Sequence, residues 1–457
     1  MTYLRRIIAG LLMAAAIQYI PLFTLACFAS RSDRPLTFSC WLPLLAVFLF
    51  LNVRPLPKTA PTGRIQQLAE AVELLQLFAA EFLVSLIIQI LFLWAVVFRI
   101  IPTPGGVGRP LLLSADLTLV ILSLCALFWS GMLRVYLTSV QLGIKHRLLA
   151  ALCGWIPLVN VWYLMKIIRI AKDEVEFETQ KWELDLVRAE SEVCKTKYPL
   201  LMVHGVFFRD FRYLNYWGRI PKELIRNGAV VCYGQQQSAA SVEDSGKELA
   251  ARIRQIAEET GCEKVNIIAH SKGGLDSRAA LAQDGCARYV ATLTTINTPH
   301  RGCIFAEYLY DKIPHSARLK LAAAYNAAMK KAGDPNPDFL AAVYDLTERA
   351  CLARNQVLPN APGVVYESVM SYCRKAQHGR FPLNMIHPIV KHFDGLNDGL
   401  VSVESAKWGS NFTLLEPVGK RGISHGDVVD LNRENIRGFD VREFYVKLAA
   451  DLKRRGY

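Results

Sequence analysis

The sequence predicts an α/β protein, a mostly parallel sheet with a helical insertion, preceded by an all-α membrane region. Two observations carry this prediction. Long apolar runs crowd the chain before Lys172, and strand-like runs alternate with helical patterns after Tyr198. Strands that alternate with helices favour a parallel sheet covered on both faces. Apolar runs of about 20 residues are long enough to cross a bilayer.

The positive charge of the chain is concentrated at its start. Its 457 residues are too many for one ordinary domain, and the mean hydropathy of +0.21 is high for a soluble protein. Residues 1–172 hold 15 Lys or Arg against 5 Asp or Glu, and the remainder holds 38 against 35. These cationic residues flank the apolar runs, which predicts a membrane partner and no nucleic-acid partner. The chain has no zinc-finger, Walker or dinucleotide-binding pattern, and we expect no cofactor.

Five apolar runs define the N-terminal region, residues 1–172. They are 7–28, 37–53, 74–101, 111–140 and 148–168. The second run is short and the fifth contains Gly154, Pro157 and Asn160, so we expect four or five membrane spans. A secretory signal peptide is the alternative for the first run, but the four further runs favour a retained helix.

A charged segment, residues 173–197, follows the last apolar run. Its sparse apolar positions, among them Val175, Trp182 and Leu186, recur at roughly helical spacing. We therefore expect a helical linker between the membrane region and a globular domain at 198–457.

The globular domain shows alternating strands and helices. The strand-like runs are YPLLMVHG, GAVVCYG, KVNIIAH and YVATLTTINT, and a helical pattern at 242–259 separates the second from the third. In sheets of this kind, sites form beyond the carboxyl ends of the strands. Ser271 follows the third run directly, which places it where chemistry is expected.

Ser271 stands in the sequence AHSKGG, at the junction of a strand and a helix. A nucleophile elbow needs small residues around its serine, because the turn is strained and brings the helix close to the strand. The usual pattern is G-x-S-x-G, and Ala269 takes the place of the first glycine here. An ordinary helix N-cap is the alternative role for this serine.

A serine nucleophile requires a general base and a carboxylate that orients the base. In this fold class the acid and then the histidine follow the serine along the chain. Asp398 lies in the Gly-rich turn before GLVSV, and His425 follows the strand-like run NFTLLEPV. The competing acids are Asp394 and Asp427. The competing bases are His270, His300, His315, His378, His387 and His392. His270, on the elbow itself, is expected to pack beside the turn and point away from the nucleophile.

Acyl transfer also needs backbone N–H groups that stabilise an oxyanion. One is expected from Lys272, the residue after the serine, and the other from a loop after an early strand. In the run LLMVHGVFF, Gly205 permits the turn and the N–H of Val206 is expected to point inward.

Five blocks of the globular domain resemble, in order, those of bacterial triacylglycerol lipases of the α/β-hydrolase fold. They are LLMVHGVFF, IIAHSKGGLDSR, INTPHRG, GLNDGLVSVESAKWG and SHGDVVDLN. The resemblance covers residues 198–457 and none of the membrane region. It implies Ser271 as the nucleophile, Asp398 as the acid and His425 as the base. It also implies Val206 and Lys272 as the oxyanion-hole donors.

The resemblance also bears on metal binding, because several such lipases hold a structural calcium near the catalytic histidine. Asp427 matches one ligand position of that kind. Leu431 stands where an amide ligand would be expected, and no second carboxylate is evident. We therefore expect no metal in this chain.

Aromatic residues crowd the loop after Val206, beginning with Phe207 and Phe208. We expect these two side chains to line an acyl pocket, with core packing as the alternative role. Residues 303–363 form an insertion with helical stretches near 316–331 and 338–350, of a size that suits a lid or a fixed cap. The expected substrate is a lipid or another acyl ester.

These residues predict a membrane-anchored serine ester hydrolase, either a lipase or an esterase. An acyltransferase or a lipid-remodelling deacylase would use the same triad. A non-catalytic membrane or transport protein is the third alternative, because Glu81 and Asp116 lie in or near the apolar runs. The intact order of Ser, Asp and His argues against it. Seven of the 11 cysteines follow Lys172 without a paired framework, which favours a cytoplasmic setting for the globular domain.

Overall fold

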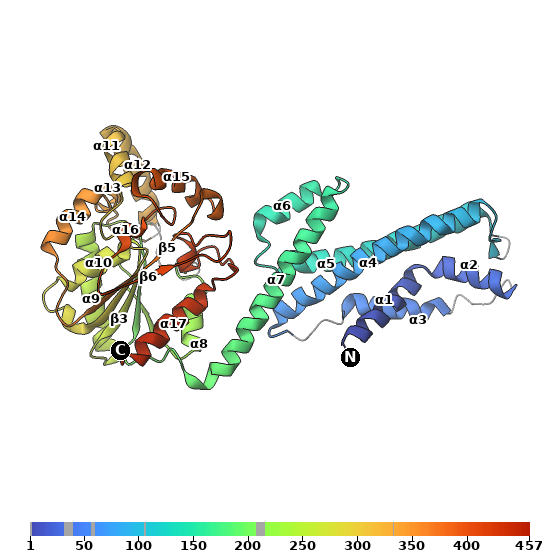
Figure 1. Ribbon diagram of the computed structural model, residues 1–457, viewed down its shortest axis with the longest axis horizontal. Helices are drawn as coiled ribbons and strands as arrows, with labels where there is room; N and C mark the ends of the chain where they lie inside the picture. Colours follow the sequence, from blue (N-terminus) through green and yellow to red (C-terminus); the bar gives the residue numbers. More distant parts are fainter. Residues whose placement is uncertain (1, 32–39, 56–59, 105–106, 207–214, 332) are drawn as a thin grey trace. The chain divides into compact units, whose positions relative to one another are not determined.

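The computed structural model describes residues 2–31, 40–55, 60–104, 107–206, 215–331 and 333–457 (Figure 1). The chain divides into two compact units, Met1–Leu184 and Asp185–Tyr457. The described part of the first unit is helical, and the second unit contains a sheet. Each unit buries hydrophobic clusters of its own.

Seven helices occupy the described part of the first unit. They are α1 Thr2–Ile17, α2 Tyr19–Ser30, α3 Trp41–Val53, α4 Gly63–Val97, α5 Arg109–Thr138, α6 Gly143–Cys153 and α7 Val159–Arg188, the last of which continues into the second unit. Close packing joins α4 to α5, because a Cβ at Gly131 would lie 2.8 Å from Leu75 Cγ. A salt bridge of 3.0 Å between Arg134 and Glu70 joins the same two helices.

By length and composition, α4 and α5 could each cross a membrane. The helices α1 and α2 meet at a bend of 78° and add a third candidate only if they form one bent span. The described residues thus offer two or three candidate spans by length and composition, beside the four or five that the sequence predicts. With 13 residues, α3 reaches only about 20 Å against a hydrocarbon core of about 30 Å. The predicted run 148–168 is interrupted, since α6 ends at Cys153 and α7 begins at Val159.

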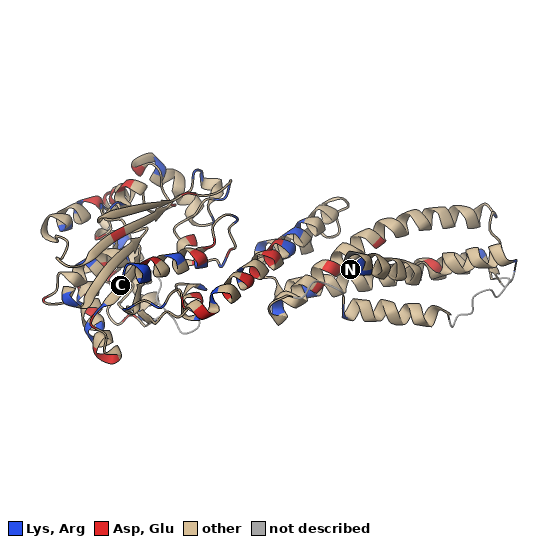
Figure 2. Cartoon of the chain, turned by 60° about the horizontal axis from the view of Figure 1, so that its bottom comes forward, with Lys and Arg blue, Asp and Glu red and all other residues tan. Residues whose placement is uncertain are grey.

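The change from apolar to charged sequence falls inside one helix. α7 begins in the last apolar run and continues without a break through the charged segment to Arg188. A short 3-10 turn, Ala189–Ser191, follows it. In Figure 2 the ribbon of α7 is coloured blue and red at many Lys, Arg, Asp and Glu positions, whereas most of the ribbon of α4 and α5 is tan. The first part of the charged segment, as far as Arg188, is therefore a continuation of α7.

Six parallel strands form the sheet of the second unit, in the order β2-β1-β3-β4-β5-β6. The strands are β1 Leu200–Val203, β2 Val231–Tyr233, β3 Val265–His270, β4 Val290–Ile296, β5 Val365–Ser371 and β6 Asn411–Leu415. The predicted fold class, a mostly parallel sheet with helices, is confirmed. Because all the strands run the same way, the loops that follow them meet at one edge of the sheet.

Helices cover both faces of this sheet. α8 Ile220–Arg226 and α17 Val441–Arg454 pack on one face, and α9 Val242–Thr260 and α10 Lys272–Leu281 pack on the other. Leu200 and Met202 of β1 belong to the first cluster, and Leu201 and Val203 belong to the second. A strand has a side-chain period of two, so β1 buries both of its faces. This is why its sequence is continuously apolar.

A helical insertion separates β4 from β5, and two further helices lie between β5 and β6. They are α11 Ile304–Lys312, α12 His315–Lys331, α13 Phe339–Tyr344, α14 Glu348–Val357, α15 Leu383–Asp394 and α16 Val403–Ala406. Figure 1 shows α11, α12, α13 and α15 gathered at one edge of the sheet. The predicted helical stretch 338–350 is two helices, because the side chain of Thr347 caps a new N-terminus by accepting the N–H of Ala350.

Replacing Gly273 by alanine tests the close approach of α10 to β1. A Cβ at Gly273 would lie 2.4 Å from the carbonyl oxygen of His204 and 2.8 Å from that of Val203. Backbone atoms cannot move aside as a flexible side chain can, so we expect Gly273→Ala to destabilise the second unit by about 1–3 kcal/mol. The measurement is the midpoint of its unfolding transition in denaturant.

Gly379→Ala is the matched control. Its φ is −93°, and the nearest atom to an added Cβ lies 3.5 Å away, so this change should leave the midpoint nearly unaltered. Equal midpoints for the two variants would show that α10 does not depend on this contact.

Candidate active site

Ser271 lies in the sharp turn between β3 and α10, in a conformation that side chains avoid. Its φ is 56° and its ψ is −131°, a region in which residues other than glycine are strained. Its N–H donates to the carbonyl oxygen of Ile296 on the neighbouring strand at 2.9 Å. Gly274 packs tightly, because a Cβ there would lie 2.2 Å from Thr298 Oγ1. Tertiary contacts therefore hold this turn at the carboxyl edge of the sheet.

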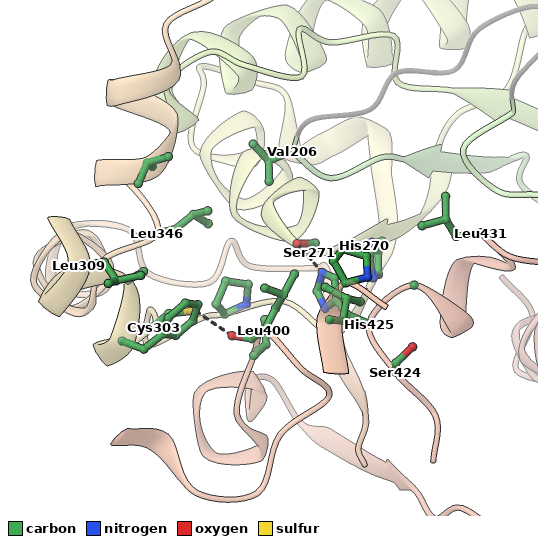
Figure 3. Close-up of a pocket in the computed structure, with 18 of the residues that line it drawn as sticks. Val206, His270, Ser271, Cys303, Leu309, Leu346, Leu400, Ser424, His425 and Leu431 are labelled. Carbon is green, nitrogen blue, oxygen red and sulfur yellow. Dashed lines mark hydrogen bonds between the residues drawn. The ribbon is translucent and has the colours of Figure 1, made fainter. Parts of the chain in front are cut away.

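The structure brings the three predicted triad residues into one hydrogen-bonded chain. His425 Nε2 lies 3.0 Å from Ser271 Oγ (Figure 3), and His425 Nδ1 lies 2.7 Å from Asp398 Oδ2. Ser271 and His425 are each 7% exposed, and Asp398 is fully buried. When Nδ1 donates to the carboxylate, Nε2 is left to accept the serine proton, as a general base requires.

Four donors surround the carboxylate of Asp398. Its Oδ1 accepts the backbone N–H groups of Leu400 at 2.9 Å and Val401 at 2.8 Å. Its Oδ2 accepts Asn297 Nδ2 at 2.6 Å besides His425 Nδ1. These bonds stabilise a buried charge and fix the direction in which the carboxylate meets the histidine.

The competing acids have other partners. Asp394 accepts the backbone N–H groups of Ile304 and Phe305 at the start of α11, at 3.4 Å each. Asp427 forms a salt bridge of 2.9 Å with Arg421 and accepts the Ser424 hydroxyl at 2.6 Å. Burial raises the pKa of the Asp427 carboxyl, although Arg421 lowers it.

Arg421 binds the carboxylate of Asp427, the residue that the resemblance matches to a calcium ligand. Both carboxylate oxygens of Asp427 lie 2.9 Å from Arg421 Nη2. Across the described ranges, no group of three His, Cys, Asp or Glu side chains is placed to hold a metal ion. The guanidinium of Arg421 thus holds the loop that carries His425 through its contacts with Asp427.

The predicted oxyanion donors, Val206 and Lys272, both follow residues that lie against or at the turn of Ser271. Gly205 approaches it so closely that a Cβ would come within 2.8 Å of Ser271 Cβ, and Val206 lies beside the serine at the cavity wall (Figure 3). Lys272 is the first residue of α10. The first N–H groups of a helix have no acceptor within the helix, which suits them to bind an anion.

Two buried histidines brace these elements. His204 Nε2 lies 3.0 Å from the carbonyl oxygen of Gln236, and Gln236 Nε2 donates to the carbonyl oxygen of His204 at 3.0 Å. His270 Nδ1 lies 2.6 Å from the Tyr216 hydroxyl, and its ring centroid is 4.5 Å from that of His425. Burial lowers the pKa of His270 well below 6.5, so this ring is neutral. As expected for a residue that packs beside the turn, His270 bonds Tyr216 and lies against the ring of His425 (Figure 3), whereas the hydrogen bond to Ser271 Oγ comes from His425.

The side chain of Lys272 is buried under the turn. Its Nζ lies 2.7 Å from Asp276 Oδ1 and donates to Ser245 Oγ at 3.1 Å. The two charged side chains are only 1% and 2% exposed. Burial raises the pKa of Asp276 to about 6, and the neighbouring Lys272 opposes that shift. This pair connects the first turn of α10 to α9.

An apolar cavity of about 480 Å³ opens at Ser271 and His425. Leu309 and Leu346 of the insertion line it on one side, and Leu400 lies across from them (Figure 3). These wall residues are not among the predicted site residues. The signal for Leu309 was the apolar positions 305, 309 and 313, which lie four residues apart.

The predicted acyl-pocket residues Phe207 and Phe208 lie outside the described residues. Two later aromatic residues of the same loop are described. Tyr216 lines the cavity, whereas Trp217 is fully buried in the cluster beneath α17. Both roles considered for this loop, pocket wall and core packing, therefore occur in its described part.

The chain is similar to curated lipases over part of its length, although no family model matches it. It is 34% identical over 186 residues to a triacylglycerol lipase of Burkholderia plantarii, which covers 38% of this chain and 51% of that lipase. It is 34% identical over 179 residues to a triacylglycerol lipase of Pseudarthrobacter phenanthrenivorans, and the match covers 36% of this chain and 55% of that lipase. The chain thus spans about half the length of these relatives. The Staphylococcus hyicus lipase structure aligns with a TM-score of 0.44 and 18% identity, over 57% of this chain and 96% of that one.

Removing one charge of the buried Lys272–Asp276 pair should destabilise the second unit more than removing both charges. Lys272→Met leaves the carboxylate of Asp276 buried without its cation, which we expect to destabilise the second unit by about 3–5 kcal/mol. The double variant Lys272→Met/Asp276→Leu removes both charges and should recover most of that loss. Denaturant unfolding of the wild type, Lys272→Met, Asp276→Leu and the double variant gives the coupling energy, and additive losses would contradict it.

Acid should destabilise the second unit through its buried neutral histidines. Burial lowers the pKa of His300 well below 6.5. Below pH 6.5, His300 therefore binds a proton in the unfolded chain but stays neutral in the folded chain. Each such histidine lowers the free energy of unfolding by about 1.4 kcal/mol per pH unit as the pH falls below 6.5. His300→Gln should make the loss between pH 6.5 and 5 shallower in unfolding measurements. An unchanged slope would mean that His300 accepts a proton in the folded protein.

Proposed function

We propose that this chain is a membrane-anchored serine hydrolase that cleaves carboxylic esters of lipids through an acyl-enzyme intermediate. The observation that carries the proposal is the hydrogen-bonded chain of Ser271, His425 and Asp398 at an apolar cavity. The similarity of the second unit to triacylglycerol lipases supports the same chemistry.

In the first half of the proposed reaction, Ser271 Oγ attacks the ester carbonyl carbon while His425 Nε2 takes its proton. The carbonyl oxygen becomes an oxyanion, which the N–H groups of Val206 and Lys272 stabilise. The intermediate collapses as the C–O bond to the alcohol breaks, and the protonated His425 gives its proton to the leaving alkoxide. The acyl group is then esterified to Ser271.

In the second half, a water molecule repeats the attack on the acyl-enzyme. His425 takes a proton from this water as its oxygen bonds to the acyl carbon, and the proton then passes to Ser271 Oγ as the fatty acid leaves. Asp398 stays ionised throughout, holds His425 in the required tautomer and stabilises its charged form.

Lipid esters fit the cavity because its described walls are mainly apolar. We assign the helices of the insertion, α11 to α14, the role of a lid or cap over the acyl chain. α4 and α5 serve as the membrane anchor, which keeps the hydrolase near acyl lipids. Six cysteines of the second unit are free thiols, Cys232, Cys262, Cys286, Cys303, Cys351 and Cys373, which supports a reducing, cytoplasmic setting for this unit.

The triad is tested by replacing its members. Ser271→Ala should fold normally and lose roughly 10⁴-fold or more in kcat for a short-chain ester, since only binding and the oxyanion donors remain. Asp398→Asn should cost roughly 10⁴-fold in kcat with little change in KM, because the histidine is left in the wrong tautomer. Steady-state hydrolysis and labelling by a fluorophosphonate probe provide the readouts.

Asp394→Asn is the control for the acid, because Asp394 contacts the backbone of α11. It should retain most of the activity. If Asp394→Asn were the crippled variant, the assignment of the acid would be wrong, and near-normal turnover by Ser271→Ala would end the proposal.

The anchor is tested by removing it. A fragment of residues 185–457, which keeps the whole second compact unit, should be soluble and should cleave water-soluble esters. The full chain should require detergent for extraction. A fragment that is insoluble and inactive, beside a full chain that is active in detergent, would show that the second unit depends on the first.

A further inference from the structure

One guanidinium in the cavity wall has no counter-ion among the described residues. Arg318 of α12 lines the cavity, and its Cζ lies 4.2 Å from the ring centroid of Tyr310. Its Nε is buried and meets no hydrogen-bond acceptor in the described parts of the chain. A buried donor without an acceptor is costly, so this group is set up to bind something that the folded chain itself does not supply.

The charge of the cavity wall points to an anion. The described lining contains no Asp or Glu, and its arginines are Arg318 and Arg380. Arg380 is already neutralised, because its Nε donates to Glu434 Oε2 at 2.7 Å and its Nη2 contacts the other oxygen of the same carboxylate. Arg318 is therefore the cation of the described wall that remains open to a ligand.

The ligand must combine this anion with a long apolar body. Apart from Arg318 and Arg380, the residues that line the cavity away from Ser271, on the side of the helical insertion, are apolar or aromatic. The same cavity extends to Ser271. A guanidinium presents a planar fork of N–H donors that matches a phosphate or carboxylate. Stacking on Tyr310 orients that fork without using its donors. A neutral glyceride would leave the charge of Arg318 unmatched.

We propose that Arg318 binds the phosphate group of a glycerophospholipid whose acyl ester lies at Ser271. The inference rests on the proposed function and narrows it, since it makes an anionic phospholipid the preferred substrate over a neutral glyceride. Arg318 acts here as a specificity determinant. The ester chemistry stays with the residues at Ser271.

The test compares two substrates with the same acyl chains, phosphatidylglycerol and diacylglycerol, in neutral detergent micelles with the full chain. We expect the wild type to prefer phosphatidylglycerol. Arg318→Gln should lower kcat/KM for it about 10- to 100-fold, the loss of a charge-assisted hydrogen bond, and change kcat/KM for diacylglycerol less than about 3-fold. Lys320→Gln is the matched control, because Lys320 is an exposed cation on the same helix outside the cavity lining. It should leave the substrate ratio unchanged.

Three kinetic results would overturn the role of Arg318 while leaving the hydrolase intact. The first is a wild type that cleaves diacylglycerol at least as well as phosphatidylglycerol. The second is an Arg318→Gln variant that loses activity on both substrates equally, and the third is an Arg318→Gln variant that alters only inhibition by the fatty-acid product. By contrast, failure to cleave any ester, or equal cleavage by Ser271→Ala, would overturn the proposed function.

Binding gives a readout that does not depend on turnover. Calorimetric titration of the full chain with dodecyl phosphate, below its micelle concentration, should show binding that Arg318→Gln weakens about 10-fold or more and Lys320→Gln does not. Equal binding by wild type and Arg318→Gln would overturn the phosphate site, whether or not the protein turns over esters.

Discussion

The hydrogen bond between Asp398 and His425 is the contact around which the second unit is arranged at its functional edge. It joins the loop after α15 to the loop after β6, and a backbone bond of 3.0 Å from His425 N–H to Asp398 O repeats the connection. The carboxylate can make this bond only because Asn297, which follows β4, and the Leu400–Val401 backbone hold it in place. Parallel strands make this possible, since they bring the ends of distant segments to one edge.

Strain at Ser271 is maintained by the same architecture. A residue with a side chain at φ 56° costs free energy that local sequence cannot recover. Here β4 fixes the serine N–H, and the glycines that follow let α10 lie against β1 and Thr298. The Ser271 hydroxyl therefore faces His425 because α10 packs closely against β1 and Thr298. This close packing is possible because small residues stand where α10 meets them.

The helical insertion adds what the sheet edge lacks, an apolar enclosure. Loops alone would leave the serine in water, where an acyl chain has little reason to stay. α11 to α13 place apolar side chains over the site, and the same helices bring in a single guanidinium that the described chain does not neutralise. An apolar wall with one open cation favours an apolar ligand that carries an anion, because a buried N–H donor left without an acceptor is costly.

The sequence by itself determined the layer structure and the order of the chemistry. The continuous apolar run of β1 marks a strand buried on both faces, and Ser271, Asp398 and His425 stand in the chain order expected of the α/β-hydrolase fold. The tertiary structure alone decided which of three carboxylates meets His425, that His270 lies against its ring, and that Arg421 holds Asp427. It also decided that α1 and α2 bend by 78° and that Arg318 stacks on Tyr310 from another helix. Periodicity reports which face of a segment is buried, but it carries no information on which distant segment covers that face. Those pairings depend on the closed packing of the whole unit.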